Sequence, residues 1–160
     1  MSVLRPITDA EFDAWRAATI PAYANDKVKS GRWSAESALE LSRKAVEELL
    51  PQGPATPDNY LFTILDLADN PVGTLWFAAQ DRGGTRVAYV YDVVVAPAHR
   101  RQGHAARAFD ALEMEVARLG LDGIALHLFG HNSSAHALYV KLGYVATNIS
   151  MFKPVAPARA

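Results

Sequence analysis

A short turn in the second half of the chain holds the residues with the clearest chemical meaning. It joins an apolar run, residues 90–95, to a helical pattern that begins near residue 104. Backbone N–H groups at the start of a helix have no partner inside it, and the helix dipole adds partial positive charge there. A glycine in such a turn lets an anion approach the backbone closely. We therefore expect a phosphate group to bind at Arg100, Arg101, Gln102, Gly103, His104 and Ala105.

The type of phosphate ligand is narrowed by what this turn lacks. It does not end in Gly-Lys-Ser/Thr, as a P-loop does, and it has one glycine where a dinucleotide-binding turn has three. The alternative is that Gly103 only permits tight packing at a helix start. The turn alone predicts an anion site and leaves its ligand open.

A second motif begins at Asn132. Asn132, Ala135 and Tyr139 are spaced so that they share one face of a helix, and Gly143 and Tyr144 follow it. An asparagine can cap the helix, a small alanine leaves room for close contact, and the tyrosine supplies a hydroxyl on the same side. The alternative is a capped helix whose tyrosine is simply buried.

The elements that must position these motifs follow from hydrophobic periodicity and turn residues. The expected order is βααβββαβαβ, an α/β fold with a mixed sheet. Strands are expected at residues 3–5, 60–65, 71–79, 86–95, 124–129 and 144–152, and helices at 9–20, 34–50, 104–119 and 133–142. We expect one domain over residues 1–153 and a disordered tail over 154–160.

Composition excludes several kinds of site. The chain has 160 residues, a formal net charge of -1 and no cysteine. Without cysteine there is no disulfide, thiolate metal site or cysteine nucleophile, and without a basic stripe we expect no nucleic-acid partner. No apolar run approaches the roughly 20 residues of a membrane span. We therefore expect a soluble cytoplasmic protein with no membrane partner.

Together the two motifs resemble those of the GNAT superfamily of N-acetyltransferases. Arg100-x-x-Gly103-x-Ala105 is similar to its pyrophosphate loop, and the Asn132 motif is similar to its second signature. The resemblance implies a V-shaped cleft between the fourth and fifth strands and acetyl-CoA as the co-substrate. It also implies direct attack of a primary amine on the thioester, without a covalent enzyme intermediate.

The resemblance assigns roles to individual residues. It places the pyrophosphate on the amides of residues 101–106 and Tyr139 near the thioester sulfur, where its hydroxyl can protonate the departing thiolate. The strand before the turn would pair with the pantetheine arm, as an added strand pairs with a sheet edge. The cofactor-binding set is therefore Val93, Val94, Val95, Arg100, Arg101, Gln102, Gly103, His104, Ala105, Ala106, Asn132, Ala135 and Tyr139.

Two residues are candidates for the base that deprotonates the amine. His127 lies near the end of the expected fifth strand, and its ordinary pKa suits a base. Asp92 is a charged residue in an otherwise apolar strand, where a charge needs a reason. Each has a structural alternative, a packed histidine or a carboxylate paired with a helix, and a water chain is a third route.

The acceptor side is less determined by the sequence. Tyr23, Arg32, Trp33 and Tyr91 are the candidate substrate-binding residues, with aromatic packing as the alternative. The spacing of the histidines does not match a metal site, so we expect no metal. The expected partner is a small-molecule or peptide amine, and a homodimer paired through the last strand is possible. The competing function is a non-catalytic module that binds acyl-CoA.

Overall fold

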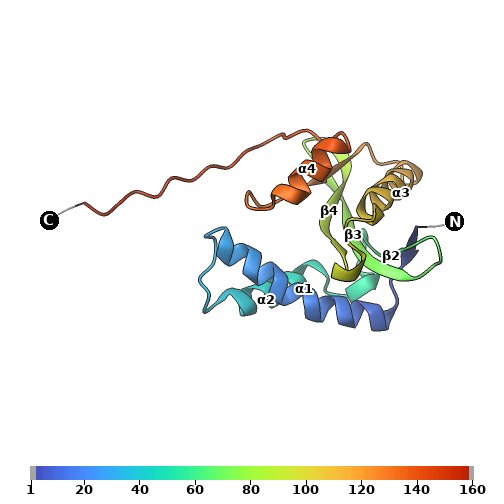
Figure 1. Ribbon diagram of the computed structural model, residues 1–160, viewed down its shortest axis with the longest axis horizontal. Coiled ribbons are helices and arrows are strands. Elements are labelled where there is room, and N and C mark those ends of the chain that lie inside the picture. The colour runs from blue at the N-terminus through green and yellow to red at the C-terminus, as the bar shows by residue number, and fades with distance from the viewer. Residues whose placement is uncertain (1–2, 159–160) are drawn as a thin grey trace.

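The computed structural model describes residues 3–158 as one sheet with helices on both faces (Figure 1). The five strands lie in the order β1-β2-β3-β4-β5; neighbours are antiparallel except β4 and β5, which are parallel. The strands are β1 (Leu4–Pro6), β2 (Asn59–Leu65), β3 (Pro71–Arg82), β4 (Thr85–Val95) and β5 (Gly123–Leu126). The α-helices are α1 (Asp9–Lys29), α2 (Ala38–Leu49), α3 (His104–Arg118) and α4 (Ser133–Lys141), with short 3-10 turns η1 (Gly53–Ala55) and η2 (Pro97–His99).

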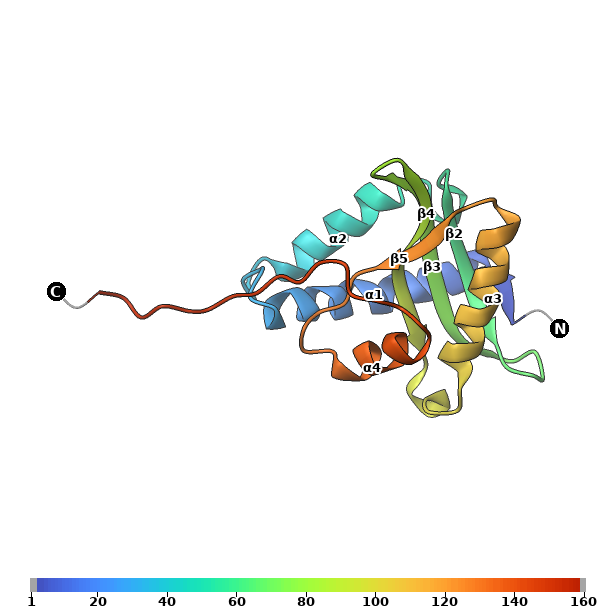
Figure 2. The same cartoon turned by 90° about the horizontal axis from the view of Figure 1, so that it is seen from above.

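Two apolar clusters bind the helices to the sheet, one on each face. Helices α1 and α2 cover one face, and α3 and α4 lie on the other (Figures 1 and 2). The α1–α2 cluster is formed by Phe12, Trp15, Val46, Leu50, Leu61 and Trp76. The larger cluster is centred on the fully buried Phe77, Phe109, Ile64, Leu75 and Leu112. Burying a side chain of this kind contributes about 1.5–3 kcal/mol, so the clusters hold the faces of the site in place.

Helix α1 begins at a capping box and runs past the expected end at residue 20. Thr8 accepts a hydrogen bond from the Glu11 amide, and the Glu11 carboxylate accepts one from the Thr8 amide. Arg5 also donates to this carboxylate, at 2.7 Å. The helix continues through Pro21 to Lys29, although a proline has no N–H to donate. The buried Ser42 hydroxyl of α2 donates to the carbonyl of Ile20 at 2.7 Å and ties the two helices together at this point.

Strands β4 and β5 pair only over part of the length of β4. The last registered pair is Val90 with Leu126, after which β4 continues to Val95 with β3 as its neighbour. A bulge opposite Trp76 and Phe77 leaves Tyr91 without a register partner. Because of the bulge, Tyr91 and Asp92 both turn toward the α1 side. The divergence of the two strands is the V-shaped opening that the resemblance implies.

A glycine in β3 is required behind this opening. A Cβ on Gly73 would lie 2.2 Å from the carbonyl oxygen of Val94, a distance that real Cβ atoms do not reach. The part of β4 after Val90, which we call its free half, has no partner on the β5 side in the described part of the chain. The bare backbone at Gly73 lets this free half lie close to β3.

The α/β fold class is confirmed, but two details of the expected order are wrong. Residues 144–152 form no strand, so the described chain ends its regular structure at α4. The fifth strand stops at Leu126 rather than at residue 129. A strand needs a neighbouring edge for its backbone groups, and the side chains of this C-terminal segment contact little. Val145, Ile149, Met151 and Phe152 are 78–92% exposed, and the chain that follows them extends away from the body in both views (Figures 1 and 2).

The homodimer expected through that strand stays a prediction, as does the division into a domain and a tail. Residues 159 and 160 of the expected tail lie outside the described residues. Within residues 3–158 no helix is both long and apolar enough to cross a membrane.

Candidate functional site

The predicted phosphate turn links β4 to α3 through η2. Arg101 and Gly103 have φ values of 61° and 81°, and Gly103 is the N-cap of α3. The first intrahelical bond runs from the Arg107 amide to the Gly103 carbonyl at 3.1 Å. Among residues 3–158, the amides of residues 101–106 have no acceptor, and the first turn of α3 has no acidic side chain. A row of free N–H groups at a helix start fits the pyrophosphate of a coenzyme.

The side chains of the turn hold its shape. Arg100 Nε donates to the carbonyl of Val95 at 3.0 Å. Arg107 donates to the carbonyl of Gln102 at 3.2 Å and to Nδ1 of His104 at 2.8 Å. His104 as a whole is 6% exposed, and Arg107 holds its ring, so the imidazole serves the shape of the turn. Arg101 and Gln102 are exposed beside the free amides.

The free half of β4 presents backbone groups to the opening. The Ala96 amide donates to Val72 of the β3 side at 2.8 Å, so the Val95 carbonyl points the opposite way, where Arg100 reaches it. Main-chain groups of successive strand residues point to opposite edges. The groups of Val93 therefore also face the open edge, as pairing with an extended ligand arm requires, while Val94 faces β3.

The Asn132 motif forms the start of α4. Asn132 is the N-cap, and its side chain accepts a hydrogen bond from the Ala135 amide at 3.3 Å. Ala135 packs against the larger core cluster, and Tyr139 is 8% exposed beside Phe109, with ring centroids 5.3 Å apart. The Tyr139 hydroxyl has no hydrogen-bond partner among the described residues, yet it is not one of the atoms sealed from solvent.

Asp92 and Tyr139 lie within each other's electrostatic reach. Burial raises the pKa of the Asp92 carboxyl to about 6, opposed by the Trp15 indole and reinforced by Asp26. Trp15 Nε1 donates to the Asp92 carboxylate at 2.9 Å and fixes it on the α1 side. Burial, with a smaller contribution from Asp92, raises the pKa of Tyr139 to about 12. At neutral pH the site therefore holds a carboxylate that can accept a proton and a phenol that can donate one.

His127 lies just beyond the end of β5 and belongs to a different group of residues. It is exposed, with its ring edge-on to Phe129 at 5.7 Å. Its pKa is lowered, chiefly by partial desolvation of the ring and then by the positive charges of Arg32 and Lys27. The structure thus gathers His127 with residues of α1 and its following loop.

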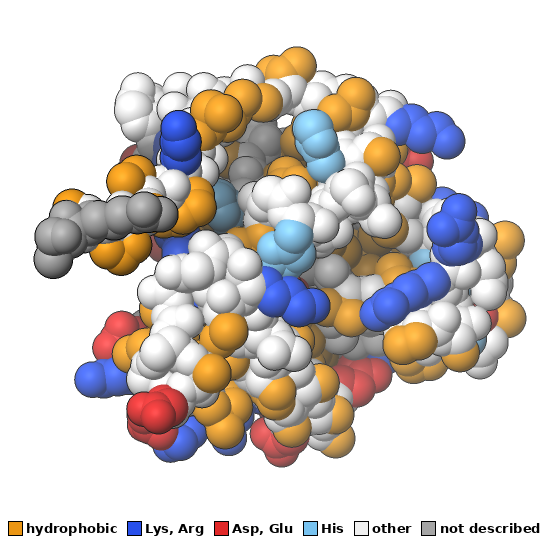
Figure 3. Space-filling view, turned by 60° about the vertical axis from the view of Figure 1, so that its left-hand side comes forward, with side chains coloured by type: hydrophobic (Ala, Val, Ile, Leu, Met, Phe, Trp, Pro, Cys, Tyr) orange, Lys and Arg blue, Asp and Glu red, His pale blue; other side chains and the backbone are white. Residues whose placement is uncertain are grey.

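The expected acceptor residues divide into two sets. Tyr23 and Trp33 pack edge-on at 5.7 Å, next to the exposed Arg32. Tyr91 instead stacks on Trp76 at 4.5 Å, and Gln80 donates to its hydroxyl at 2.6 Å. The space-filling view shows a hollow with His, Lys and Arg side chains around it (Figure 3).

Three contacting residues were missed by sequence reasoning. Trp15 holds Asp92, and Lys27 and Phe129 meet above the end of β5. Lys27 carried a weak signal, because it lies four residues after Tyr23 on one helix. For Trp15 and Phe129 no local pattern indicates the partner, since these partners are distant in sequence.

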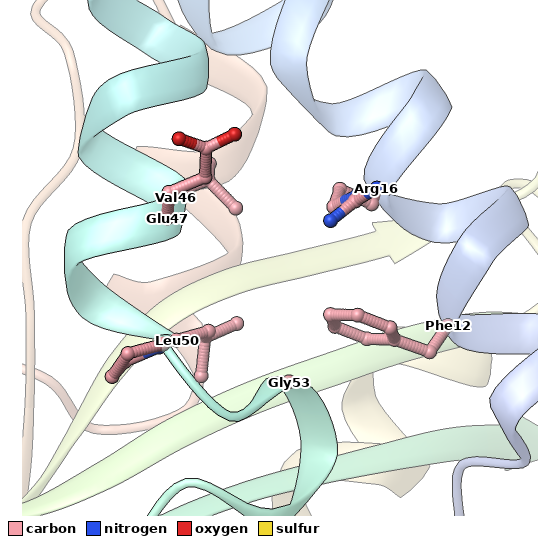
Figure 4. Close-up of a pocket in the computed structure, with 7 residues that line it drawn as sticks. Phe12, Arg16, Val46, Glu47, Leu50 and Gly53 are labelled. Carbon is pink, nitrogen blue, oxygen red and sulfur yellow. The ribbon is translucent and has the colours of Figure 1, made fainter.

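Two other features lie outside this site. Residues 3–158 contain no group of three or more His, Cys, Asp or Glu arranged to hold a metal ion. A pocket of about 150 Å³ opens between α1 and α2, where Arg16 and Glu47 stand above Phe12, Val46 and Leu50 (Figure 4). It shares no residue with the phosphate turn or with the Asp92–Tyr139 pair.

Comparison with known proteins agrees with this geometry. The model of the acetyltransferase (GNAT) family matches residues 25–144. Two curated Bacillus subtilis proteins, the uncharacterized N-acetyltransferases YdgE and YycN, are each 33% identical to this chain. YdgE matches over 94% of this chain and 96% of its own length, and YycN over 94% and 97%. The crystal structure of YycN superposes with a TM-score of 0.91 at 32% identity, covering 96% of this chain and 98% of that one.

A more distant structure shares the fold. AAC(6')-Iy, solved in complex with the bisubstrate analog CoA-S-monomethyl-acetylneamine, has a TM-score of 0.62 at 15% identity, over 96% of this chain and 97% of its own. The extent of the family match and the identity to YdgE and YycN establish that this chain belongs to the GNAT acetyltransferase family.

Proposed function

We propose that the protein transfers an acetyl group from acetyl-CoA to a primary amine by direct attack. One observation carries the proposal most strongly. The free amides of residues 101–106 adjoin the open edge of β4, and that edge leads to the Asp92–Tyr139 pair. Pyrophosphate, pantetheine arm and thioester are arranged in this order in coenzyme A, so the three features fit one extended ligand.

The protein groups would act on protons and charge. Acetyl-CoA supplies the acyl carbon as a reactive thioester. Asp92 takes a proton from the incoming ammonium, directly or through water, and frees the nitrogen lone pair. The C–N bond forms and the C–S bond breaks while a main-chain N–H of the β4 edge stabilises the charge on the carbonyl oxygen. Once the C–N bond has formed, the nitrogen loses its second proton to water. Tyr139 donates its hydroxyl proton to the departing sulfur and regains one from solvent, and Asp92 releases its proton to solvent.

Thiol release from acetyl-CoA across a panel of amines tests this function. We expect release that depends on the amine, with the acetylated amine found by mass spectrometry. The competing function is a non-catalytic acyl-CoA-binding module. Tight binding of acetyl-CoA, with no turnover of any amine, would establish that alternative instead.

Substitution of two neighbouring tyrosines tests the proton donor. Tyr139→Phe should lower kcat by about 100-fold, the low end for general acid catalysis, and change the Kd of acetyl-CoA little. Tyr144→Phe is the matched control, because its ring lies 5.6 Å from that of Tyr139 and its hydroxyl is buried without a partner. Removing an unpaired buried hydroxyl should leave kcat near that of the unmodified protein. Equal losses of kcat and affinity in Tyr139→Phe would exclude the donor role.

A further inference from the structure

Three aromatic rings from separate segments surround the ammonium of Lys27. Its Nζ lies 5.3 Å from the ring centroids of Tyr23 and of Trp33, and 5.9 Å from that of Phe129. Tyr23 belongs to α1, Trp33 to the loop after it, and Phe129 to the segment between β5 and α4. Contacts of this type attract a cation to a ring face. They hold the Lys27 charge in one place instead of leaving it free in solvent.

Lys27 is part of a cationic rim that we define as Lys27, Arg32 and His127. Burial and then Arg32 lower the pKa of Lys27, and burial, then Arg32 and Lys27, lower the pKa of His127, so the histidine is a neutral member of the rim at pH 7. The three groups therefore lie within each other's fields. Within residues 3–158 none of them forms a salt bridge with a carboxylate. The positive charges of Lys27 and Arg32 repel each other, and an anion placed between them would relieve that repulsion.

The rim lies beside the groups proposed to act on the amine. Asp26, one residue before Lys27, raises the pKa of Asp92, so the two carboxylates are close enough to interact. Asp26 also accepts a hydrogen bond from Nε2 of His131 at 3.3 Å, which ties α1 to the segment after β5. His127 begins that same segment, at the point where β4 and β5 have diverged. The region around Asp26 thus brings the Asp92 carboxylate near the rim.

We propose that the cationic rim binds an anionic group of the acceptor, so that the substrate is a small amine that also carries a carboxylate or a phosphate. The inference rests on the proposed acetyl transfer, and it adds the substrate class. The ammonium of such a molecule would lie toward Asp92 and its anion toward Arg32 and Lys27. The protein would thus offer a negative group to the ammonium of the substrate and positive groups to its anion.

Matched pairs of amines test the proposal directly. In each pair only one member carries the anion: an L-amino acid against its amide, or phosphoethanolamine against ethanolamine, compared at equal concentrations of the unprotonated amine. We expect kcat/KM for thiol release to be at least about tenfold higher for the anionic member, as one charged hydrogen bond would give. A preference in the first pair alone identifies a carboxylate, and in the second pair alone a phosphate.

Charge-removing variants then locate the effect. Arg32→Gln and Lys27→Gln should raise KM for the anionic amine and reduce its advantage over the uncharged partner. Lys29→Gln removes the same charge from an exposed residue of the same helix that contacts none of these groups, and it should keep the full advantage. Retention of the advantage in both rim variants would overturn the assignment of the rim.

Failure of the inference and failure of the proposed function give different results. Equal kcat/KM for both members of every pair overturns the anion site and leaves acetyl transfer standing. If no amine releases thiol, acetyl transfer itself is refuted. Calorimetry with the same amines and the CoA-bound protein then tests whether the rim binds an anion. Tighter binding of the anionic members supports the anion site, and equal binding overturns it.

Discussion

The two sides of the proposed site are built from different parts of the chain. The donor side consists of main-chain groups, the amides of residues 101–106 and the free edge of β4, within one continuous stretch. The acceptor side consists of side chains from α1, its following loop, β4 and the segment after β5. A backbone cradle depends on φ/ψ and on a helix start, whereas a side-chain surface can change by substitution. The donor side is therefore suited to an invariant ligand and the acceptor side to a particular one.

A charge placed in the backbone cradle should give the largest effect. Gly103→Asp puts a carboxylate at the N-cap of α3, where the free amides would otherwise meet the pyrophosphate. Like charges about 4 Å apart near a protein surface repel by roughly 4 kcal/mol, so the Kd of acetyl-CoA should rise by about 1,000-fold. Isothermal titration calorimetry measures this change.

The other end of α3 provides the control for that variant. Gly120 also has a positive φ, 70°, and a Cβ there would have no heavy atom within 4 Å. Gly120→Asp therefore carries a similar backbone strain without a charge near the cradle. Its Kd should stay close to that of the unmodified protein, and a similar loss in both variants would mean that strain, not charge, is responsible.

The same contrast explains what the sequence could predict. The turn at Gly103 and the Asn132 cap are local, because their residues are neighbours in the chain and their geometry follows from residue type. The bond from Trp15 to Asp92 joins residues 77 apart, and nothing near either residue indicates the other. The strand predicted at 144–152 was based on an apolar pattern that is present in the sequence. Such a pattern does not show whether a neighbouring strand edge is available for pairing.

The pH dependence of kcat should identify which residue is the base on the acceptor side. Asp92 acts as a carboxylate, and its pKa is raised to about 6, so kcat should fall as the pH drops below about 6. Asp92→Asn keeps an oxygen that can accept from Trp15, lowers kcat by about 100-fold and removes this limb of the profile. The measurement is kcat from pH 5 to 9 with saturating amine.

The variant His127→Gln is compared with Asp92→Asn for the same fall of kcat at low pH. The pKa of His127 is lowered from its ordinary value, chiefly by burial, so His127 is the other group near the site whose titration could produce an acidic limb. If Asp92 is the base, His127→Gln retains the limb and changes mainly KM. A limb that survives in Asp92→Asn and disappears in His127→Gln would assign the base to the histidine.

The smallest effect is expected where α1 is anchored to the sheet. Glu11 accepts hydrogen bonds from Arg5, from Thr63 and from the Thr8 amide, and chiefly the Arg5 bond lowers its pKa from 4.5 to about 2. Because the folded state favours the carboxylate, its contribution is complete above pH 4.5 and is lost as the pH falls toward 2.

Glu11→Gln should therefore lower the free energy of unfolding by about 1 kcal/mol at pH 7, as expected for loss of a capping interaction, and by less at pH 3. Urea denaturation at the two pH values measures the difference, with Glu47→Gln of α2, which forms no salt bridge within the described part of the chain, as the control. Since α1 carries Trp15 and Lys27 but no donor-side group, Glu11→Gln should raise KM for the amine and leave the Kd of acetyl-CoA unchanged. An equal change in both constants would show that the two sides of the site are coupled through α1.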